Sequence, residues 1–507
     1  MTRPTSLNAA RRARELDGLA ADPAVDVVVI GAGVTGAGVA LDAAARGLGV
    51  VLVDRHDLAF GTSRWSSKLV HGGLRYLAKA QVGVAYESAR ERDVLMRVTA
   101  PHLVRTMPMV VPLHETVDTA HATVTRTGVA MGDLLRVAAG TDRGTLPRSR
   151  RLNRAQTARL LPGIRDTGLR GGILSFDGQL TDDARLVVAL ARTAAGLGAR
   201  VITRCAAEQA HGDGVVLRDT RTGERLEVRA RAVVNATGVY AGELVPGLRL
   251  RPSRGTHLVL PAEALGHPRT AVTVPIPGSF NRFVLVLPQR DGRVFVGLTD
   301  EPVDGPLPEV PEVPESDIAF LLGVVNGITT RPLRRSDVIG AYAGLRPLLD
   351  AGDRSSADLS RRHAVLVADN GVISVVGGKL TTYRSMAQDA VDMAVRTSRL
   401  AAGRCRTREL PLVGAADRNT LDAVPAERRL VARYGTEAAA VIEEAVGDPA
   451  LLAPVANGVT PAELRFAVRH EGALDVSDLL DRRTRIGLVP EDRAKAVAAA
   501  EEALAAG

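Results

Sequence analysis

The chain has 507 residues, which is too long for one ordinary hydrophobic core and predicts two or three domains. It is 46% hydrophobic and 24% charged with a formal net charge of +8, but its basic residues form no run of five and no zinc-finger or RNA-binding motif, so no nucleic acid is expected as a partner. Two cysteines, Cys205 and Cys405, exclude a disulfide framework, and without metal-ligand spacing no metal is expected.

Residues 1–24 predict a mobile lead-in with a short helix and lack the apolar core of a signal peptide. The most hydrophobic stretch, 27–45, is interrupted by Asp42 and by glycines, which indicates strand, turn and helix and not a membrane span. No transmembrane helix is therefore expected. The basic balance favours anionic small molecules or a lipid headgroup surface as partners.

A single βαβ unit follows, with a strand, a glycine-rich turn, a helix and a second strand at 25–30, 31–38, 39–46 and 50–53. In this context Gly31 permits a tight turn, Gly33 lets the backbone approach a pyrophosphate, and Gly36 lets helix and strand pack closely. Asp54 closes the second strand, where a carboxylate can accept a hydrogen bond from a ribose hydroxyl. The unit predicts a dinucleotide site and leaves FAD and NAD open.

The rest of the chain alternates between both kinds of element. Further helices are predicted at 84–98, 182–197 and 381–396, and further strands at 171–176, 201–203, 215–217, 224–228, 232–235, 258–260, 283–287, 294–297 and 372–376. Prolines break the region after residue 100, 113–150 has no clear pattern, 301–315 predicts an irregular loop, and the last hundred residues or so are helical by pattern. The small-residue turn at 235–238 and the late strand–Gly–Gly–helix segment at 372–396 give a bipartite layout typical of flavoproteins, which favours FAD.

Seven ordered motifs then resemble the FAD-dependent glycerol-3-phosphate dehydrogenase family. They are SSKLVHGGLRYL at 66–77, TDDARL at 181–186, NATG at 235–238, RGTH at 254–257, GLTD at 297–300, AGLRPL at 343–348 and GGKLTTYR at 377–384. The last is identical to the family pattern, and the resemblance runs from about 25 to 395, with Arg482-Arg483-Thr484 similar to the family's C-terminal domain. Gln289 and Leu298 depart from the pattern, and residues 113–150 match poorly.

The resemblance implies an α/β fold with a Rossmann-like two-dinucleotide-binding FAD domain, an antiparallel-sheet substrate domain and an all-helical C-terminal domain. The expected ranges are 22–80, 168–250 and 345–398 for the FAD domain, 81–167 and 251–344 for the substrate domain, and 405–507 for the helices.

The implied reaction is oxidation of sn-glycerol 3-phosphate to dihydroxyacetone phosphate by hydride transfer to FAD, with electrons passing to a membrane quinone. An oxidase that uses oxygen and gives hydrogen peroxide is the alternative, and a flavoenzyme for another 2-hydroxy or amino acid and a non-catalytic FAD-binding regulator are weaker ones. The quinone implies a cytoplasmic protein in peripheral contact with the inner face of the cell membrane, and a homodimer stays open.

The family pattern also implies a set of cofactor-binding residues: Gly31, Gly33, Gly36, Asp54, Ser66, Ser67, Lys68, Leu69, His71, Gly72, Gly73, Ala236, Gly238, Gly378, Lys379, Leu380, Thr381 and Thr382. Thr381 and Thr382 begin a helix whose N-terminus would stabilise negative charge on the reduced flavin.

A substrate phosphomonoester is close to a dianion, and removing it from water requires cations, with Arg suited to bidentate contact. The substrate-binding residues implied by the resemblance are Arg75, Tyr76, His257, Arg346, Arg361 and Lys379, with Arg362 an alternative to Arg361. The catalytic set is His257, Arg346 and Lys379. A neutral His257 would accept the C2 hydroxyl proton, and Lys379 or Arg346 would stabilise a developing alkoxide.

Overall fold

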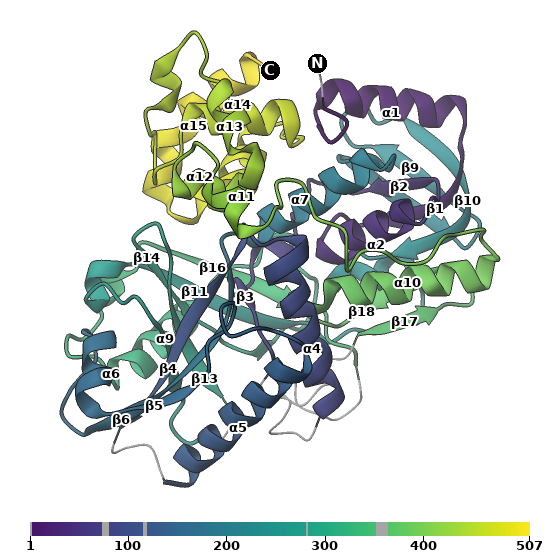
Figure 1. Ribbon diagram of the computed structural model, residues 1–507. Coiled ribbons are helices and arrows are strands. Elements are labelled where there is room, and N and C mark those ends of the chain that lie inside the picture. Colours follow the sequence, from purple (N-terminus) through teal and green to yellow (C-terminus); the bar gives the residue numbers. More distant parts are fainter. Residues whose placement is uncertain (1–2, 74–80, 115–118, 280–281, 351–362) are drawn as a thin grey trace.

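The computed structural model describes residues 3–73, 81–114, 119–279, 282–350 and 363–507, and the side chains of 119–128 are left aside. Two large sheets lie side by side, and the helices at the C-terminal end of the chain form a separate group above them (Figure 1).

The first sheet has eight strands and contains the predicted βαβ unit. Its strand order is β17-β18-β10-β1-β2-β7, with the β8–β9 hairpin attached through β9 to β10. The strands are β1 (Ala24–Ile30), β2 (Val50–Val53), β7 (Arg200–Ile202), β8 (Cys205–His211), β9 (Gly214–Asp219), β10 (Arg225–Asn235), β17 (Ala364–Val367) and β18 (Ile373–Val376). β7, β2, β1, β10 and β18 are parallel, as in a Rossmann-like sheet.

Three helices cover one face of this sheet and bury its apolar side chains: α2 (Val34–Ala45), α7 (Asp183–Gly196) and α10 (Tyr383–Ser398). The predictions at 25–30, 50–53 and 182–197 are confirmed, and Asp182 caps α7 by accepting from Ala184 N at 3.0 Å. The two strands predicted at 224–228 and 232–235 are one continuous strand, β10.

The short helix expected within 1–24 is confirmed as α1 (Ala9–Ala21). The expectation that this segment is mobile is wrong, because Leu19 is completely buried in the core on the other face of the first sheet. Arg12 is also buried and pairs with Asp219 at 2.9 Å. Asp219 is remote from α1 in the chain, so the local sequence alone could not indicate this contact.

The second sheet has ten strands in the order β15-β11-β14-β13-β12-β4-β6-β3, with β16 paired to β11 and β5 to β6. They are β3 (Leu69–Val70), β4 (Val104–His114), β5 (Arg150–Leu152), β6 (Leu169–Leu180), β11 (Ser253–Pro261), β12 (Ala271–Pro275), β13 (Phe283–Pro288), β14 (Arg293–Gly297), β15 (Glu301–Pro302) and β16 (Gly340–Arg346). Only β12 and β4 pair in parallel among the described strands of this sheet, so the predicted antiparallel character is confirmed in the main.

Two parts of this region were not predicted. β4 contains Pro108 and Pro112, which predict a broken stretch, but it meets β12 only at Met109 and Val110, so elsewhere one side of the strand needs no ladder hydrogen bond. Helix α5 (Thr119–Ala138) lies within the stretch that has no clear pattern.

The remaining helices are α4 (Val82–Val94), continued by a wider turn at Leu95–Thr99, α6 (Arg154–Leu160), α8 (Ala241–Leu244) and α9 (Glu315–Asn326). The C-terminal group contains α11 (Arg418–Asp422), α12 (Arg428–Tyr434), α13 (Ala438–Glu443), α14 (Pro461–His470) and α15 (Pro490–Ala505), which confirms the helical pattern. In the part of the chain that the structure describes, no helix combines the length and the apolar character needed to cross a bilayer.

Buried ion pairs hold the C-terminal helices against the first sheet. Asp57, in the loop after β2, accepts from Arg482 Nε at 2.6 Å and from Arg483 Nη1 at 2.7 Å, and Arg185 on α7 pairs with Glu471. All five side chains are nearly inaccessible to solvent. Asp57 belongs to the loop 54–61, several residues of which line the candidate site.

Candidate active site

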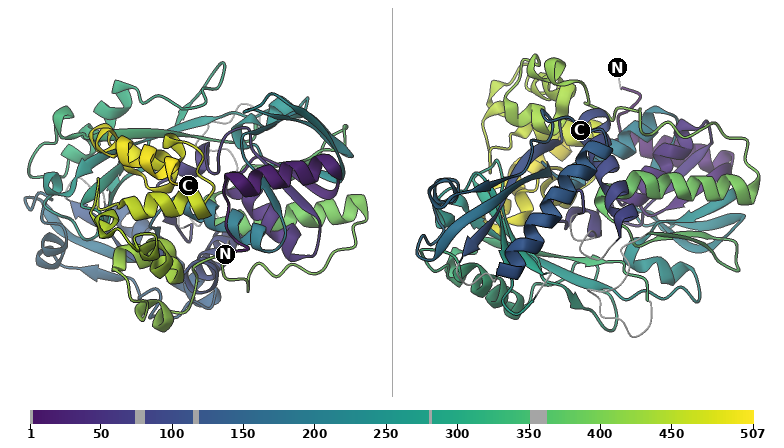
Figure 2. Two further views of the ribbon diagram at one scale, coloured as in Figure 1. Left: turned by 90° about the horizontal axis from the view of Figure 1, so that it is seen from above. Right: turned by 60° about the horizontal axis from the view of Figure 1, so that its bottom comes forward.

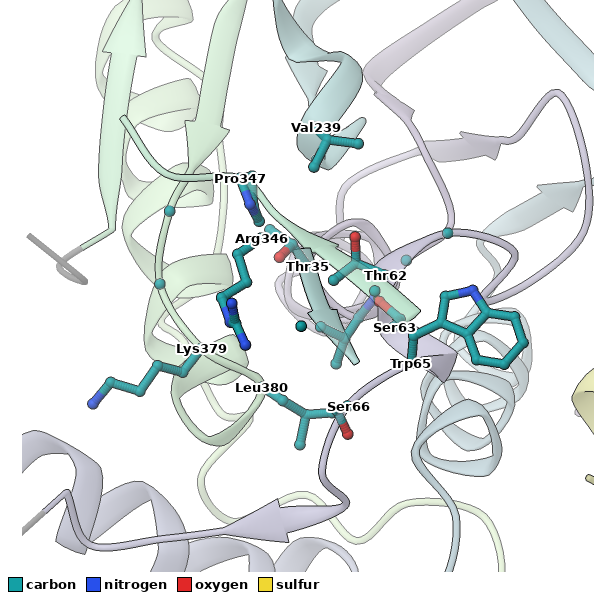
Figure 3. A pocket seen from close by; sticks show the side chains of 18 of the residues that line it. Thr35, Thr62, Ser63, Trp65, Ser66, Val239, Arg346, Pro347, Lys379 and Leu380 are labelled. Atoms are coloured by element: carbon teal, nitrogen blue, oxygen red, sulfur yellow. The ribbon is translucent and has the colours of Figure 1, made fainter. Parts of the chain in front are cut away.

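A cavity of about 820 Å³ is walled by segments of both sheets. Its walls come from the glycine turn after β1, the segment 60–69, the turn 236–240, and the loops 344–348 and 377–381 (Figure 3). The volume falls within the range of roughly 300–1,000 Å³ that is usual for small-molecule and cofactor sites.

The glycine turn gives this cavity an anion-binding end. Gly31 has φ +101°, and a Cβ placed on Gly36 would lie only 1.8 Å from the carbonyl oxygen of Gly31. Gly33, Val34 and Thr35 at the N-terminus of α2 line the cavity, so the positive end of a twelve-residue helix opens onto it.

Asp54 also borders the cavity, at the end of β2 beside the turn. Its carboxylate accepts from Ala32 N at 2.7 Å and from His56 N at 2.8 Å, which fixes its orientation. Burial raises the pKa of this carboxyl above its ordinary value, although the two backbone donors oppose the shift. A helix N-terminus and a carboxylate across one turn fit the pyrophosphate and ribose of a dinucleotide.

The segment 61–69 forms another wall and is anchored from behind by Asp183 at the start of α7. Ser66 Oγ donates to Asp183 Oδ2 at 2.7 Å, and Lys68 Nζ donates to the same oxygen at 2.8 Å. Ser63 Oγ accepts from Val34 N at 2.8 Å and so ties the segment to α2. The sequence motif therefore forms a rigid wall whose shape depends on a carboxylate remote in the chain.

Lys68 is a correction to the predicted cofactor contacts. Its side chain is completely buried, also donates to Arg64 O at 2.6 Å, and does not border the cavity. Burial lowers the pKa of Lys68 to about 8, partly offset by Asp183. The ammonium thus serves the internal ion pair and does not face the cavity.

Gly72, Gly73 and Thr382 also lie outside the cavity wall. Gly72 N donates to Asp177 Oδ1 at 3.0 Å and Gly73 N to His71 Nδ1 at 3.2 Å, while Thr382 Oγ1 donates to Lys379 O at 3.3 Å. Gly36 supports Gly31 from behind. The other predicted cofactor residues border the cavity: Gly31, Gly33, Asp54, Ser66, Ser67, Leu69, His71, Ala236, Gly238, Gly378, Lys379, Leu380 and Thr381.

At the other end of the cavity lies His257 on β11. Its Nε2 is 2.8 Å from Ser67 Oγ, and its ring stacks on Tyr342 of β16 with centroids 4.9 Å apart. Burial, reinforced by the charges of Lys68 and Arg346, holds the pKa of His257 well below its ordinary value. The imidazole is therefore neutral at pH 7 and able to accept a proton.

Arg346, at the end of β16, lines the same end of the cavity. Its Nη1 lies 2.9 Å from Asp300 Oδ1, and its Nη2 donates to Thr299 O at 3.1 Å. Ser253 Oγ donates to Asp300 as well. The guanidinium is held in place by a carboxylate and a carbonyl at the cavity edge.

Lys379 contributes to the wall, but its amine is directed elsewhere. Its Nζ is 2.7 Å from Ser88 Oγ on α4, and Figure 3 shows the end of the side chain pointing away from Arg346. The structure therefore brings His257 and Arg346 to one end of the cavity, with the Lys379 amine turned toward α4.

Three further predicted substrate residues, Arg75, Tyr76 and Arg361, lie outside the described residues. Sequence reasoning missed Asp183 and Tyr342. The signal for Asp183 is its position within the TDDARL motif. The signal for Tyr342 is that it is an aromatic residue in a chain in which aromatic residues make up only 3%. No group of three His, Cys, Asp or Glu side chains suited to a metal ion occurs among the residues that the structure describes.

Two family models match the chain. One, described as FAD dependent oxidoreductase, matches residues 26–384, and the other, described as the C-terminal domain of alpha-glycerophosphate oxidase, matches residues 405–506. Glycerol-3-phosphate dehydrogenase 1 of Mycobacterium tuberculosis (strain ATCC 25618 / H37Rv) is 54% identical over 513 aligned residues, which cover 99% of each chain.

Two solved structures are similar to the whole chain or most of it. The X-ray structure of the glycerol-3-phosphate dehydrogenase from Bacillus halodurans complexed with FAD has a TM-score of 0.77 at 26% identity, covering 98% of this chain and 94% of that one. The L-alpha-glycerophosphate oxidase from Mycoplasma pneumoniae with FAD bound has a TM-score of 0.58 at 18% identity, covering 77% of this chain and 99% of that one, and shows a shared fold alone.

Proposed function

This chain belongs to the FAD-dependent glycerol-3-phosphate dehydrogenase family, and from that membership we propose that it oxidises sn-glycerol 3-phosphate to dihydroxyacetone phosphate. The observation that carries the proposal is the 54% identity to the M. tuberculosis protein along essentially the whole of both chains. Its cofactor is FAD. The glycine turn, the N-terminus of α2 and Asp54 fit the dinucleotide part of FAD.

Arg346 supports a phosphorylated substrate. A guanidinium held by Asp300 and Thr299 O at the cavity edge brings a positive charge in a fixed position, which suits a substrate phosphate. Arg75, Tyr76 and Arg361 would complete the phosphate site by the family pattern, whereas the Lys379 amine is turned toward Ser88.

His257 is the proposed base for the C2 hydroxyl proton. Its pKa lies below the ordinary histidine value because the ring is buried beside Lys68 and Arg346, so it is unprotonated at neutral pH, which is the form that a base requires. Ser67 and Tyr342 keep the ring in place from two sides. When bound, FAD supplies the two-electron acceptor for the hydride at C2.

A membrane quinone is the proposed electron acceptor, which would place the protein in the cytoplasm on the inner face of the cell membrane. Oxygen is the second candidate, because the family model that matches 405–506 is described as part of alpha-glycerophosphate oxidase. Stoichiometric hydrogen peroxide from glycerol 3-phosphate in air would favour oxygen. Reduction of an added quinone with little peroxide would favour the dehydrogenase.

The decisive experiment is anaerobic addition of glycerol 3-phosphate to the yellow holoenzyme. We expect the flavin absorbance near 450 nm to bleach, since the absorbance reports the oxidised ring. Arg346→Ala should need a far higher substrate concentration, whereas Arg335→Ala, which removes an exposed guanidinium paired with Glu315, should bleach like the wild type. Failure of the wild-type flavin to bleach would reject this substrate and leave a flavoenzyme for another substrate or a non-catalytic FAD-binding protein. Bleaching of Arg346→Ala by a non-phosphorylated hydroxy or amino acid would point to a different substrate.

A further inference from the structure

Helix α5 exposes apolar side chains along its outer face. Leu134 is 70% and Val137 62% exposed, and Met131 is exposed one turn earlier. From residue 129 to residue 140 the other exposed positions are alanine or glycine. The spacing of three residues places these large side chains in one stripe, which is an unusual outer surface for a helix in water.

The inner face of the same helix is apolar as well and is covered by protein. Val129 is buried against Leu113 and Ile173 and lines the active-site cavity. Leu135 packs against the buried Val84 and Ala85 of α4. Helix α5 therefore has two apolar faces. The inner face packs against the rest of the fold, and the fold does not need the outer stripe for that packing.

Positive charge borders this stripe. The segment 143–151 contains four exposed arginines, Arg143, Arg148, Arg150 and Arg151, and no acidic residue. The segment is fastened to α5, because Ser149 N donates to Asp133 Oδ2 at 3.2 Å, immediately before Leu134 in the helix. The arginines on either side of Ser149 are thus held next to the exposed stripe.

We propose that the outer face of α5 and the arginines of 143–151 dock the protein on an anionic lipid bilayer. An apolar stripe bordered by arginines matches the acyl boundary and the acidic headgroups of such a surface. A second copy of the chain would bring the same positive charges together and is the less suitable occupant. The inference rests on the proposed function, in which the electron acceptor is in the membrane.

The position of α5 agrees with this orientation. The helix lies at the end of the molecule away from the C-terminal helices, which would remain in water (Figures 1 and 2). The adjacent helix α4 also exposes Val82 and Tyr86. Because Val129 lines the cavity, docking through α5 would hold a cavity wall close to the lipid surface.

The test is co-sedimentation of the FAD-loaded full-length protein with vesicles of phosphatidylcholine alone or mixed equally with phosphatidylglycerol. We expect strong binding to the mixed vesicles and weak binding to neutral ones. Leu134→Glu combined with Val137→Glu should weaken binding at least about ten-fold, because it places charge in the acyl boundary. The matched control is Val446→Glu, which alters a residue that is 84% exposed in the C-terminal part and should bind like the wild type.

A second pair of variants tests the charge without altering α5. Arg148→Glu with Arg150→Glu should weaken binding to anionic vesicles by well over about five-fold, since each basic residue near the surface contributes about five-fold. Arg418→Glu with Arg428→Glu changes net charge equally on exposed C-terminal residues and should have much less effect. Equal effects of both pairs would overturn the proposal, as would wild-type binding by the α5 variant.

Two further readouts separate the possible causes. Sedimentation velocity measures whether the Leu134→Glu and Val137→Glu substitutions convert a dimer to a monomer. If they do so without loss of vesicle binding, the stripe contacts a second copy of the chain and lipid docking is refuted. Oxidation of glycerol 3-phosphate with a soluble dye should be unaffected in every variant. If the wild type does not oxidise glycerol 3-phosphate with the dye, the proposed function is rejected. The vesicle result still decides the docking surface in that case.

Discussion

The junction between Asp57 and the C-terminal arginines can be tested by one substitution, Asp57→Asn. The carboxylate accepts three charge-assisted hydrogen bonds, from Arg482 Nε at 2.6 Å and from Arg483 Nη1 and Nη2 at 2.7 and 2.8 Å. Burial would raise the pKa of Asp57, but the two arginines hold it well below its ordinary value. The native state therefore depends on the ionised carboxylate.

The size of the effect follows from what each arginine keeps. Arg482 keeps its pair with Asp478, whereas Arg483, whose side chain is fully buried, loses the carboxylate that it contacts and keeps hydrogen bonds to the Glu471 carbonyl and to the new amide oxygen. Removing one partner of a buried pair costs about 3–5 kcal/mol. We expect Asp57→Asn to destabilise this junction by that amount, which favours its opening by roughly 10²–10⁴-fold.

Hydrogen exchange of the holoenzyme, read by mass spectrometry over 471–489, measures this opening. Amides there should exchange roughly 10²–10⁴-fold faster in Asp57→Asn, up to the limit set by global unfolding. Asp166→Asn removes an exposed carboxylate paired with Arg154 and should leave exchange there unchanged. Asp57→Leu combined with Arg483→Met should recover most of the loss, because an apolar replacement leaves neither of these two buried charges unpaired. An increase below about ten-fold, or an equal one in Asp166→Asn, would refute the reasoning.

Three other predictions concern single residues. Gly36→Ala should purify without FAD, because its Cβ would lie 1.8 Å from the Gly31 carbonyl oxygen, and the ratio of flavin to protein absorbance measures this loss. Gly18→Ala, with no atom within 4 Å of the new carbon, should keep its full complement of FAD. Because burial lowers the pKa of His257, its neutral form stabilises the fold above about pH 6.5, and this stabilisation declines as the pH falls. The ring proton resonance of His257, assigned by its loss in His257→Asn, should therefore not shift between pH 8 and pH 6. A shift of the size of an ordinary histidine titration in that range would contradict the account. Burial raises the pKa of Cys205 to about 12, so a thiol reagent at pH 8 should label it in urea but not in the native protein, and rapid native labelling would show that the site is open.

Much of the first sheet could be predicted because its elements follow local rules. The run of β-branched residues before Gly31, the glycine spacing and the strand that ends at Asp54 need only neighbouring residues to be interpreted. The seven motifs led to the family, which the comparisons confirm. FAD and the three-part fold followed from that resemblance and are confirmed as well.

Helix α5 shows where local reasoning ended. Its apolar residues lie on both faces, so the contrast that marks an amphipathic helix is weak, and the sequence could not indicate which face is covered. The prolines of β4 posed a similar difficulty, because their tolerance depends on which side of the strand has a neighbour.

By itself, the sequence determined the dinucleotide turn, the family and a set of cofactor residues, most of which border the cavity. Only the tertiary structure decided which way their side chains point. Lys68 pairs with Asp183, 115 residues later, and so faces away from the cavity, while Lys379 reaches Ser88 on α4, 291 residues earlier. A motif records which residue types are present, but a charged side chain turns toward the partner that best compensates its burial, and that partner is chosen by packing between segments remote in the chain.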